Sequence, residues 1–208
     1  MSTKWVRMPL LFFLLGMPVA FYIFLQSFGE NEYDLPVLYE DGIPDPIPGC
    51  AENRKPHAIE QLVNEGPCQS WDCSDIDGKL VIFSFAKMGC TTTHLGEIAR
   101  ICNIYRNQSL FHAVTVPLDS EVQPKTQDQS ASLYGLSQDI WSWWPYYQNV
   151  ASLVQCGFNL NMDCDTSDQL VLVDSLFQIR GYYLASDLQE MDRLVTEIKL
   201  LLMNMGDG

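Results

Sequence analysis

The chain has 208 residues, and its 26 Asp and Glu side chains outnumber its 12 Lys and Arg, so that the net charge at pH 7 is −14. This excess of carboxylates argues against a nucleic-acid-binding protein, because binding to a phosphate backbone needs a basic surface. The length is sufficient for one domain with a hydrophobic core and additional segments.

The N-terminal 28 residues contain no Asp or Glu, and residues 9–28 are almost entirely apolar. A helix of this length spans about 30 Å, the thickness of the hydrocarbon core of a membrane. We therefore predict a transmembrane anchor at 9–28 and a cytoplasmic tail at 1–8, since Lys4 and Arg7 favour the cytoplasmic side. A cleaved signal peptide is the alternative, but the stretch is long for one and no small-x-small cleavage site follows it. The rest of the chain would then lie on the periplasmic side of an inner (cytoplasmic) membrane, held by a single pass.

Residues 29–56 are rich in Pro, Gly and acidic residues, and they are predicted to form an extended linker without a core. The folded domain is predicted at 57–204. Asp77 and Gly78 provide a turn signal just before its first clear strand.

Residues 80–85 (LVIFSF) form an apolar run of the kind found in strands buried on both faces. After a short connection, Cys90 precedes a helix predicted from the apolar stripe between Leu95 and Tyr105. The start of that helix favours a thiolate at Cys90, because the helix dipole is positive there. His94 is expected one turn further along on the same face. Cys90 and His94 are therefore the candidate catalytic residues of the sequence.

A second strand is predicted at 111–118, and the strand–helix–strand order implies a right-handed crossover between two parallel strands. A short helix at 127–136 is expected to follow. The aromatic cluster at 141–147 is interpreted as core packing in preference to an exposed docking patch. Pro145 suits the first turn of a helix that runs to about Cys156.

Two further strands are predicted at 170–174 and 179–184, and the short turn between them makes them a hairpin. The last helix is expected to begin at a Ser-x-x-Gln capping box at 186–189 and to present one apolar face to the core.

Seven cysteines lie beyond the predicted anchor, at positions 50, 68, 73, 90, 102, 156 and 164. An exported compartment permits disulfides, and the odd number leaves at least one cysteine without a partner in the chain. Cys102 lies on the apolar face of a predicted helix and is expected to be an inert core residue. The pairs Cys68–Cys73 and Cys156–Cys164 are near enough in sequence to be bridged, but spacing does not determine connectivity. The cysteine between the first strand and its helix is the candidate for the unpaired thiol.

Three other polar residues are weaker candidates for functional groups. His57 lies in a loop flanked by Pro and is expected to be exposed, whereas His112 opens a strand and is expected to pack or to lie on the surface. Asp119 follows the second strand, where ligand sites gather in α/β proteins, but a turn cap is the preferred interpretation.

The order strand–helix–strand, helix, hairpin and final helix is that of the thioredoxin fold. The domain is therefore predicted to be α/β, with a mixed central sheet flanked by helices behind a single N-terminal transmembrane helix. Residues 170–202 (LVLVDSLFQIRGYYLASDLQEMDRLVTEIKLLL) resemble the C-terminal part of the SCO/SenC family, and KLVIFSFAKMGC and the predicted anchor agree with this resemblance. The segment FGENEYDLPVLY is similar to members from bacteria of the Bacteroidetes type. The resemblance covers most of 10–202 and is weak at 123–161.

The resemblance implies a membrane-anchored, thioredoxin-fold protein that delivers copper during assembly of cytochrome c oxidase. Its partner would be a respiratory oxidase subunit or another exported protein.

The copper ligands of the family are a C-x3-C motif and a distal His, and this chain departs from both. Cys90 matches the first cysteine, but the second falls on His94, so that the motif reads C-x3-H. The distal His falls near Thr166. Cys164, two residues earlier, could supply a third ligand, so that Cys90, His94 and Cys164 would form a permuted copper site of thiolate and imidazole. A bridge from Cys156 to Cys164 would consume that ligand.

Three functions remain open from the sequence. The first is copper delivery or oxidase assembly through an altered site of Cys90 and His94. The second is a thiol-redox protein that uses Cys90 and needs a resolving cysteine from elsewhere in the chain. The third is a binding or assembly protein in which the site has been lost. A non-enzymatic role is preferred, and the fold alone does not choose between the three.

Overall fold

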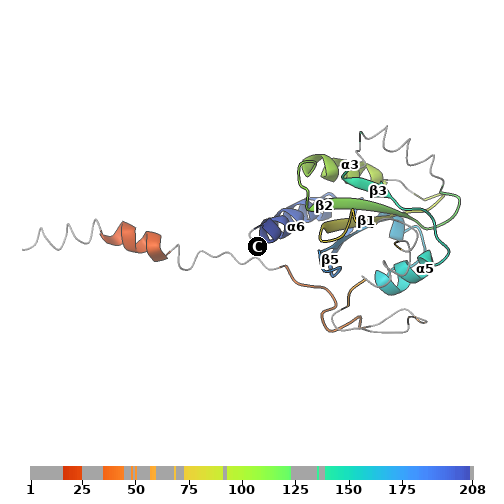
Figure 1. The fold of residues 1–208 in the computed structure, drawn as a ribbon, viewed down its shortest axis with the longest axis horizontal. Coiled ribbons are helices and arrows are strands. Elements are labelled where there is room, and N and C mark those ends of the chain that lie inside the picture. Colours follow the sequence, from red (N-terminus) through yellow and green to blue (C-terminus); the bar gives the residue numbers. More distant parts are fainter. Residues whose placement is uncertain are drawn as a thin grey trace, which may run out of the picture. The chain divides into compact units, whose positions relative to one another are not determined.

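The computed structural model describes residues 16–24, 35–44, 48, 50, 57–59, 68, 73–90, 93–122, 135 and 139–206 (Figure 1). The chain divides into two compact units, Met1–Asp34 and Leu35–Gly208. In the first unit, residues 16–24 are helical, and apolar side chains such as Met17 and Phe21 are exposed. None of the helices in the described ranges combines the length and the apolar character needed to span a bilayer. Much of the predicted anchor at 9–28, namely 9–15 and 25–28, lies outside the described residues.

The second unit is built on a mixed sheet, which within the described residues has five strands in the order β3-β2-β1-β4-β5. These strands are β1 (Leu80–Ala86), β2 (Phe111–Pro117), β3 (Trp141–Trp143), β4 (Gln169–Val173) and β5 (Ile179–Leu184). The central strand β1 pairs parallel with β2, with Leu80 opposite Phe111, and antiparallel with β4, with Phe83 opposite Val171. The predicted parallel crossover and the predicted hairpin of β4 and β5 are both confirmed.

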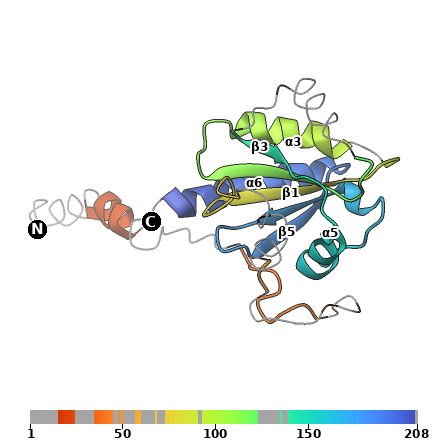
Figure 2. The same ribbon diagram turned by 45° about the vertical axis from the view of Figure 1, so that its right-hand side comes forward.

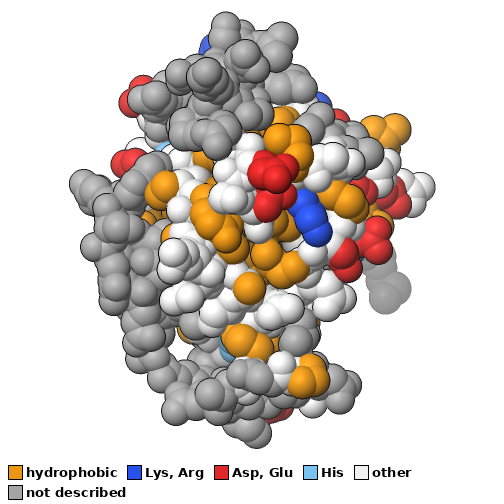
Figure 3. All heavy atoms as spheres, turned by 90° about the vertical axis from the view of Figure 1, so that its right-hand side faces the viewer, with side chains coloured by type: hydrophobic (Ala, Val, Ile, Leu, Met, Phe, Trp, Pro, Cys, Tyr) orange, Lys and Arg blue, Asp and Glu red, His pale blue; other side chains and the backbone are white. Residues whose placement is uncertain are grey.

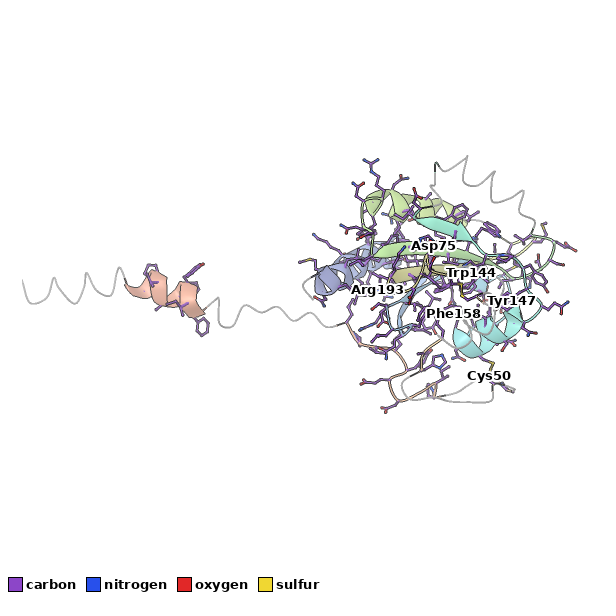
Figure 4. All side chains as sticks on the ribbon, in the orientation of Figure 1. Cys50, Asp75, Trp144, Tyr147, Phe158 and Arg193 are labelled. Carbon is purple, nitrogen blue, oxygen red and sulfur yellow. A yellow bond between two sulfur atoms is a disulfide. The ribbon has the colours of Figure 1, made fainter. Side chains whose placement is uncertain are left out.

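Strand β1 is buried on both faces because its side chains alternate between two hydrophobic clusters. Leu80 and Ile82 pack in the cluster with α3 (Thr93–Ile104) and α6 (Leu188–Gly206). On the other face, Phe83 contacts Trp144 and Phe158, with ring centroids 5.5 Å and 4.9 Å away (Figure 4).

That second face is covered by α5 (Val150–Ser152) and by the π-helix η2 (Leu153–Gly157), which follows it directly. Figures 1 and 2 show α3 and α5 as separate elements on the two sides of the sheet. The architecture is the predicted mixed sheet flanked by helices, the thioredoxin-like arrangement.

Strand β3 was missed by the sequence analysis, which interpreted 141–147 as core packing. The packing itself is as predicted, because Trp141, Trp143 and Trp144 are buried. Three residues are too short for a periodic signal, so only the pairing of Ala113 with Trp141 reveals the strand. The helix expected from Pro145 begins later, at Val150. The helix expected at 127–136 lies outside the described residues apart from Gly135.

The folded unit extends further toward the N-terminus than the predicted domain of 57–204. The backbone N–H of Leu38 donates to the carbonyl of Ile179 on β5 at 2.8 Å, and Ile43 is buried. His57 N–H donates to the carbonyl of Tyr39 at 3.1 Å. Part of the predicted linker at 29–56 is therefore packed on the domain, because its apolar residues meet the edge of the sheet.

The N-cap of the last helix lies one residue later than predicted. Asp187 Oδ1 accepts hydrogen bonds from the backbone N–H groups of Gln189 at 2.8 Å and Glu190 at 3.4 Å, so Asp187 is the N-cap. Ser186 instead donates to Asp168 Oδ2. The capping box predicted at 186–189 is thus wrong in its capping residue, although the helix and its apolar face are as predicted.

Candidate thiol–disulfide site

Cys90 lies where the sequence predicts it, between the central strand and the first helix of the sheet. The backbone turns through Gly89, which has φ +79°, and Cys90 N–H donates to the carbonyl of Lys87 at 3.3 Å. Glycine suits this position because a residue with a side chain is strained at positive φ. Helix α3 begins three residues after Cys90, at Thr93.

Two side chains hold the turn before Cys90 against neighbouring loops. Asp119 Oδ2 accepts a hydrogen bond from Met88 N–H at 3.0 Å, and its Oδ1 accepts one from Val122 N–H at 3.1 Å. Lys87 Nζ donates to the carbonyl of Met162 at 2.7 Å. The preferred interpretation of Asp119 as a turn cap is confirmed. The same carboxylate also joins the loop after β2 to the loop that carries Cys90.

Cys90 is bonded to Cys164, with an S–S distance of 2.02 Å and a sequence separation of 74. Cys164 lies just before the 3-10 helix η3 (Thr166–Asp168), and its carbonyl accepts Ser167 N–H at 3.1 Å. Asp163 Oδ1 fixes this loop by accepting Thr166 N–H at 3.1 Å. Cys90 is therefore not the unpaired thiol, and the expectation that it would be is wrong.

The remaining cysteines settle the connectivity that spacing left open. Cys156 pairs with Cys50, not with Cys164, across 106 residues of sequence (Figure 4). The predicted Cys68–Cys73 bridge is present. Cys102 is the free cysteine, and burial raises the pKa of its thiol to about 12, so it is the inert core residue that the sequence predicts. All seven cysteines fall in the described ranges, and among them Cys164 alone is exposed.

His94 is buried in α3 with 1 % of its surface exposed. Within the described part of the chain, neither ring nitrogen has a hydrogen-bond partner of acceptable geometry. Burial lowers the pKa of His94 to about 4, and the Asp168 carboxylate and the nearby backbone of Ser167 oppose this only in part. The ring is therefore a neutral imidazole at pH 7 and not the imidazolium that would lower the pKa of a neighbouring thiol.

A pocket of about 210 Å³ opens beside the disulfide. Most of its wall is apolar, and both Cys90 and His94 contribute to it. The complete lining is Ala86, Lys87, Met88, Gly89, Cys90, His94, Leu95, Val122 and Trp143. Sequence reasoning identified Cys90 and His94 but missed Val122 and Trp143, which come from the loop after β2 and from the short strand β3.

The structure thus brings together the three residues of the predicted site in two different ways. Cys90 and Cys164 are covalently bonded, and Cys90 and His94 line one pocket. Across the described residues, His, Cys, Asp and Glu side chains form no group of three or more arranged to hold a metal ion. The disulfide explains this for the predicted set, since both sulfurs are bonded to each other.

Two other histidines are buried in the fold. His57 was expected to be exposed, but its Nε2 lies 2.7 Å from the carbonyl of Gly157, so that expectation is wrong. His112 is packed inside the sheet, with its Nε2 3.0 Å from Ser142 Oγ. Neither lines the pocket beside the disulfide.

The fold of this chain is similar to that of solved protein structures. A SCO1/SenC family lipoprotein from Bacillus anthracis is 14% identical and aligns with a TM-score of 0.53 over 63% of this chain and 86% of that chain. The fold is that of the SCO/SenC structures. BsSco, described as a member of the Sco family of cytochrome c oxidase assembly proteins, aligns with a TM-score of 0.52 at 15% identity, over 62% of this chain and 82% of its own. Neither a protein-family model nor a curated protein sequence matches the chain.

These alignments confirm the SCO/SenC resemblance at the level of the fold. The structure shows where the residues lie that depart from the C-x3-C motif and distal His of the family. His94, where the sequence resemblance places the second motif cysteine, is buried in α3, and Thr166, near which it places the distal His, is buried in η3. Cys164 corresponds in sequence to neither the second motif cysteine nor the distal His. It lies in the loop before η3 and bonds to Cys90 from there.

Proposed function

We propose that the chain is a thiol–disulfide redox protein whose reactive pair is Cys90 and Cys164. The observation that carries this proposal is the disulfide between them, because a redox role for Cys90 needs a resolving cysteine from elsewhere in the chain. The bond is also accessible, since Cys164 is exposed and Cys90 is partly exposed.

The exchange reaction follows from the position of each sulfur. A partner thiolate attacks the sulfur of the exposed Cys164, the S–S bond breaks, and Cys90 leaves as a thiolate. The start of α3, three residues further on, stabilises that thiolate through its dipole. A second partner thiolate then attacks the mixed disulfide and releases Cys164. Overall, the partner's two thiols are oxidised to one disulfide, and the chain gains two electrons and two protons as its dithiol.

The test is to find which disulfide of the full chain is reduced first. We expect limiting dithiothreitol, followed by alkylation and peptide mapping, to label Cys90 and Cys164 before the other bonded cysteines. Exposure and a stabilised leaving group should make this reduction faster by a factor of about ten or more. Reduction of all three disulfides together, or of Cys50–Cys156 first, would contradict the proposal.

Two variants provide the matched comparison. Cys90→Ser should abolish exchange and leave Cys164 as a thiol that alkylates without prior reduction. The double variant Cys68→Ser with Cys73→Ser also removes one bond, but it should leave exchange at Cys90 and Cys164 unchanged. Failure of exchange in both variants would point to a general loss of structure.

A second candidate function is copper binding by the reduced site, as the SCO/SenC resemblance implies. The unpartnered ring nitrogens of His94 favour it, because a buried neutral imidazole is the protonation state in which His binds a metal. After reduction, Cys90 and Cys164 would add two thiolates, and this thiolate and imidazole set suits copper(I). Copper would be cargo for a respiratory oxidase subunit, the partner class suggested by the description of BsSco.

Anaerobic copper(I) titration against a chromogenic chelator tests this candidate on the fully reduced chain. We expect one tightly bound equivalent, which is lost in Cys90→Ser and in Cys164→Ser. His94→Ala should weaken binding by at least the roughly 10–100-fold that changes around metal ligands produce. His112→Gln is the control, because His112 is buried away from the pocket. Equal affinity in wild type and His94→Ala would exclude His94 as a ligand.

We further propose that residues 9–28 anchor the protein in the inner membrane with the disulfide site on the periplasmic side. The support is the apolar, acid-free N-terminus and the oxidising environment that three disulfides require. Recovery of the full chain in the alkaline-washed membrane pellet would be expected, and recovery in the soluble fraction would contradict it.

A further inference from the structure

The pocket beside Cys90 is large enough for one side chain. Its volume is about 210 Å³, and an apolar protein cavity of about 150 Å³ already admits benzene. Leu95, Val122 and Trp143 provide apolar walls from α3, from the loop after β2 and from β3. A leucine, methionine or phenylalanine side chain therefore fits, and it would lie next to Cys90.

The polar groups of the pocket do not favour a charged occupant. His94 contributes a ring that is 1 % exposed and forms part of the wall. The Lys87 ammonium is engaged with the carbonyl of Met162. A charged side chain placed in this pocket would lose hydration against its mostly apolar wall, which is costly.

The surroundings of the pocket are acidic. Asp163 and Asp165 flank Cys164, and Asp119 and Glu121 lie in the loop that supplies Val122. Figure 3 shows hydrophobic side chains together with carboxylates, and a Lys or Arg side chain between them, on the side of the molecule where β1 and β2 end, which is the right-hand side in Figure 1. The charge of the whole chain, −14, has the same sign. Such a surface attracts a cationic partner and repels an anionic one.

We infer that this pocket receives a large apolar side chain of the polypeptide that reacts with the Cys90–Cys164 disulfide, and that the acidic surroundings select partners with Lys or Arg near the reacting cysteine. The inference rests on the proposed redox function and names its substrate class: a protein thiol with apolar and basic neighbours. The apolar side chain would position the partner thiol beside the disulfide.

A panel of four synthetic peptides tests this inference on the oxidised full chain. Each peptide has one cysteine, flanked on both sides by either Leu or Ala, with either Lys or Glu as the outer residues. Mixed-disulfide formation is followed by acid quenching and mass spectrometry. We expect the Leu/Lys peptide to react about tenfold faster than the Ala/Lys and Leu/Glu peptides at low ionic strength. Equal rates for Leu and Ala peptides would overturn the inference.

A pocket-filling variant separates binding from chemistry. Val122→Trp should reduce the Leu-over-Ala preference to less than about twofold, because indole would occupy the space that the partner side chain needs. Leu188→Trp is the matched control, since Leu188 is 74% exposed and lies on α6 away from the pocket lining. A preference that persists in Val122→Trp would also overturn the inference.

Dithiothreitol reduction of the same proteins separates the redox function from the substrate preference. If Cys90–Cys164 reacts with dithiothreitol but shows no peptide preference, the substrate inference fails and the redox function stands. If the bond does not react with dithiothreitol in the folded chain, the redox function itself fails. A concentration-dependent dimer that Val122→Trp dissociates would show that a second copy of the chain occupies the pocket, and this result too would overturn the inference.

Discussion

Removing the Cys50–Cys156 disulfide is expected to lower the free energy of unfolding by about 5 kcal/mol. The bond spans 106 residues, and cross-linking a loop of that length reduces the entropy of the unfolded chain by an amount close to this value at 25 °C. It also ties the segment that begins at Leu35 to the π-helix η2, which covers the second face of the sheet. The double variant Cys50→Ser with Cys156→Ser, measured by urea unfolding, avoids a new unpaired thiol.

The Cys68–Cys73 bond provides the matched comparison. It spans only five residues, so the double variant Cys68→Ser with Cys73→Ser should lose about 2 kcal/mol by the same relation. The ratio of the two losses is more informative than either value, because both variants replace two sulfurs by two hydroxyls. Equal losses would show that loop length does not govern the stabilisation in this protein.

Acidification from pH 7 to pH 4 is expected to cost about 3 kcal/mol of stability through His112 alone. Burial lowers the pKa of His112 to about 4, and the Lys79 ammonium lowers it further, while Asp75 and the backbone of Asp139 oppose the shift. Above pH 6.5 the ring is neutral in both the folded and the unfolded chain and contributes nothing. Between pH 6.5 and pH 4, His112 is protonated in the unfolded chain but stays neutral in the folded chain. The free energy of unfolding therefore falls across this range. At about 1.4 kcal/mol per pKa unit, the shift from 6.5 to about 4 gives this figure.

His112→Gln isolates this contribution, because Gln does not titrate and can still reach the hydroxyl of Ser142. The variant should lose about 3 kcal/mol less than wild type between pH 7 and pH 4 in urea unfolding. Ser142→Ala is the control, since it removes the partner of His112 Nε2 at every pH and should leave the slope with pH unchanged. Parallel pH profiles for wild type and His112→Gln would show that His112 does not resist protonation in the fold. His94, with a pKa also lowered by burial, should act in the same direction.

The position of the Cys90–Cys164 disulfide supports the redox proposal. Both sulfurs lie at the end of the sheet where β1 and β2 finish, and the loops there are joined by Asp119 and by Lys87. The two other disulfides instead fasten segments that precede β1. Under the redox proposal, the Cys90–Cys164 disulfide exchanges with a partner, whereas the other two stabilise the fold.

Several parts of the fold follow from local sequence alone. The apolar run of β1, the hairpin of β4 and β5 and the apolar stripe of α6 are periodic patterns that short windows of sequence contain. The position of Cys90 before a helix follows from the same patterns. Strand β3 did not follow, because three residues contain no period and its existence depends on the pairing with β2.

The chemistry of the site was decided by the tertiary structure. Composition allowed seven cysteines to pair in many ways, and sequence proximity suggested Cys156–Cys164, but the fold brings the α carbons of Cys90 and Cys164 to 5.4 Å and so makes them partners. Burial likewise makes the ring of His94 neutral, with a pKa of about 4, and the sequence alone does not show this burial. Local patterns determine which elements form, since hydrophobic spacing acts over a few residues. Distances between remote side chains and their exclusion from water exist only once the elements have packed, and these decide which sulfur meets which and whether a ring is charged.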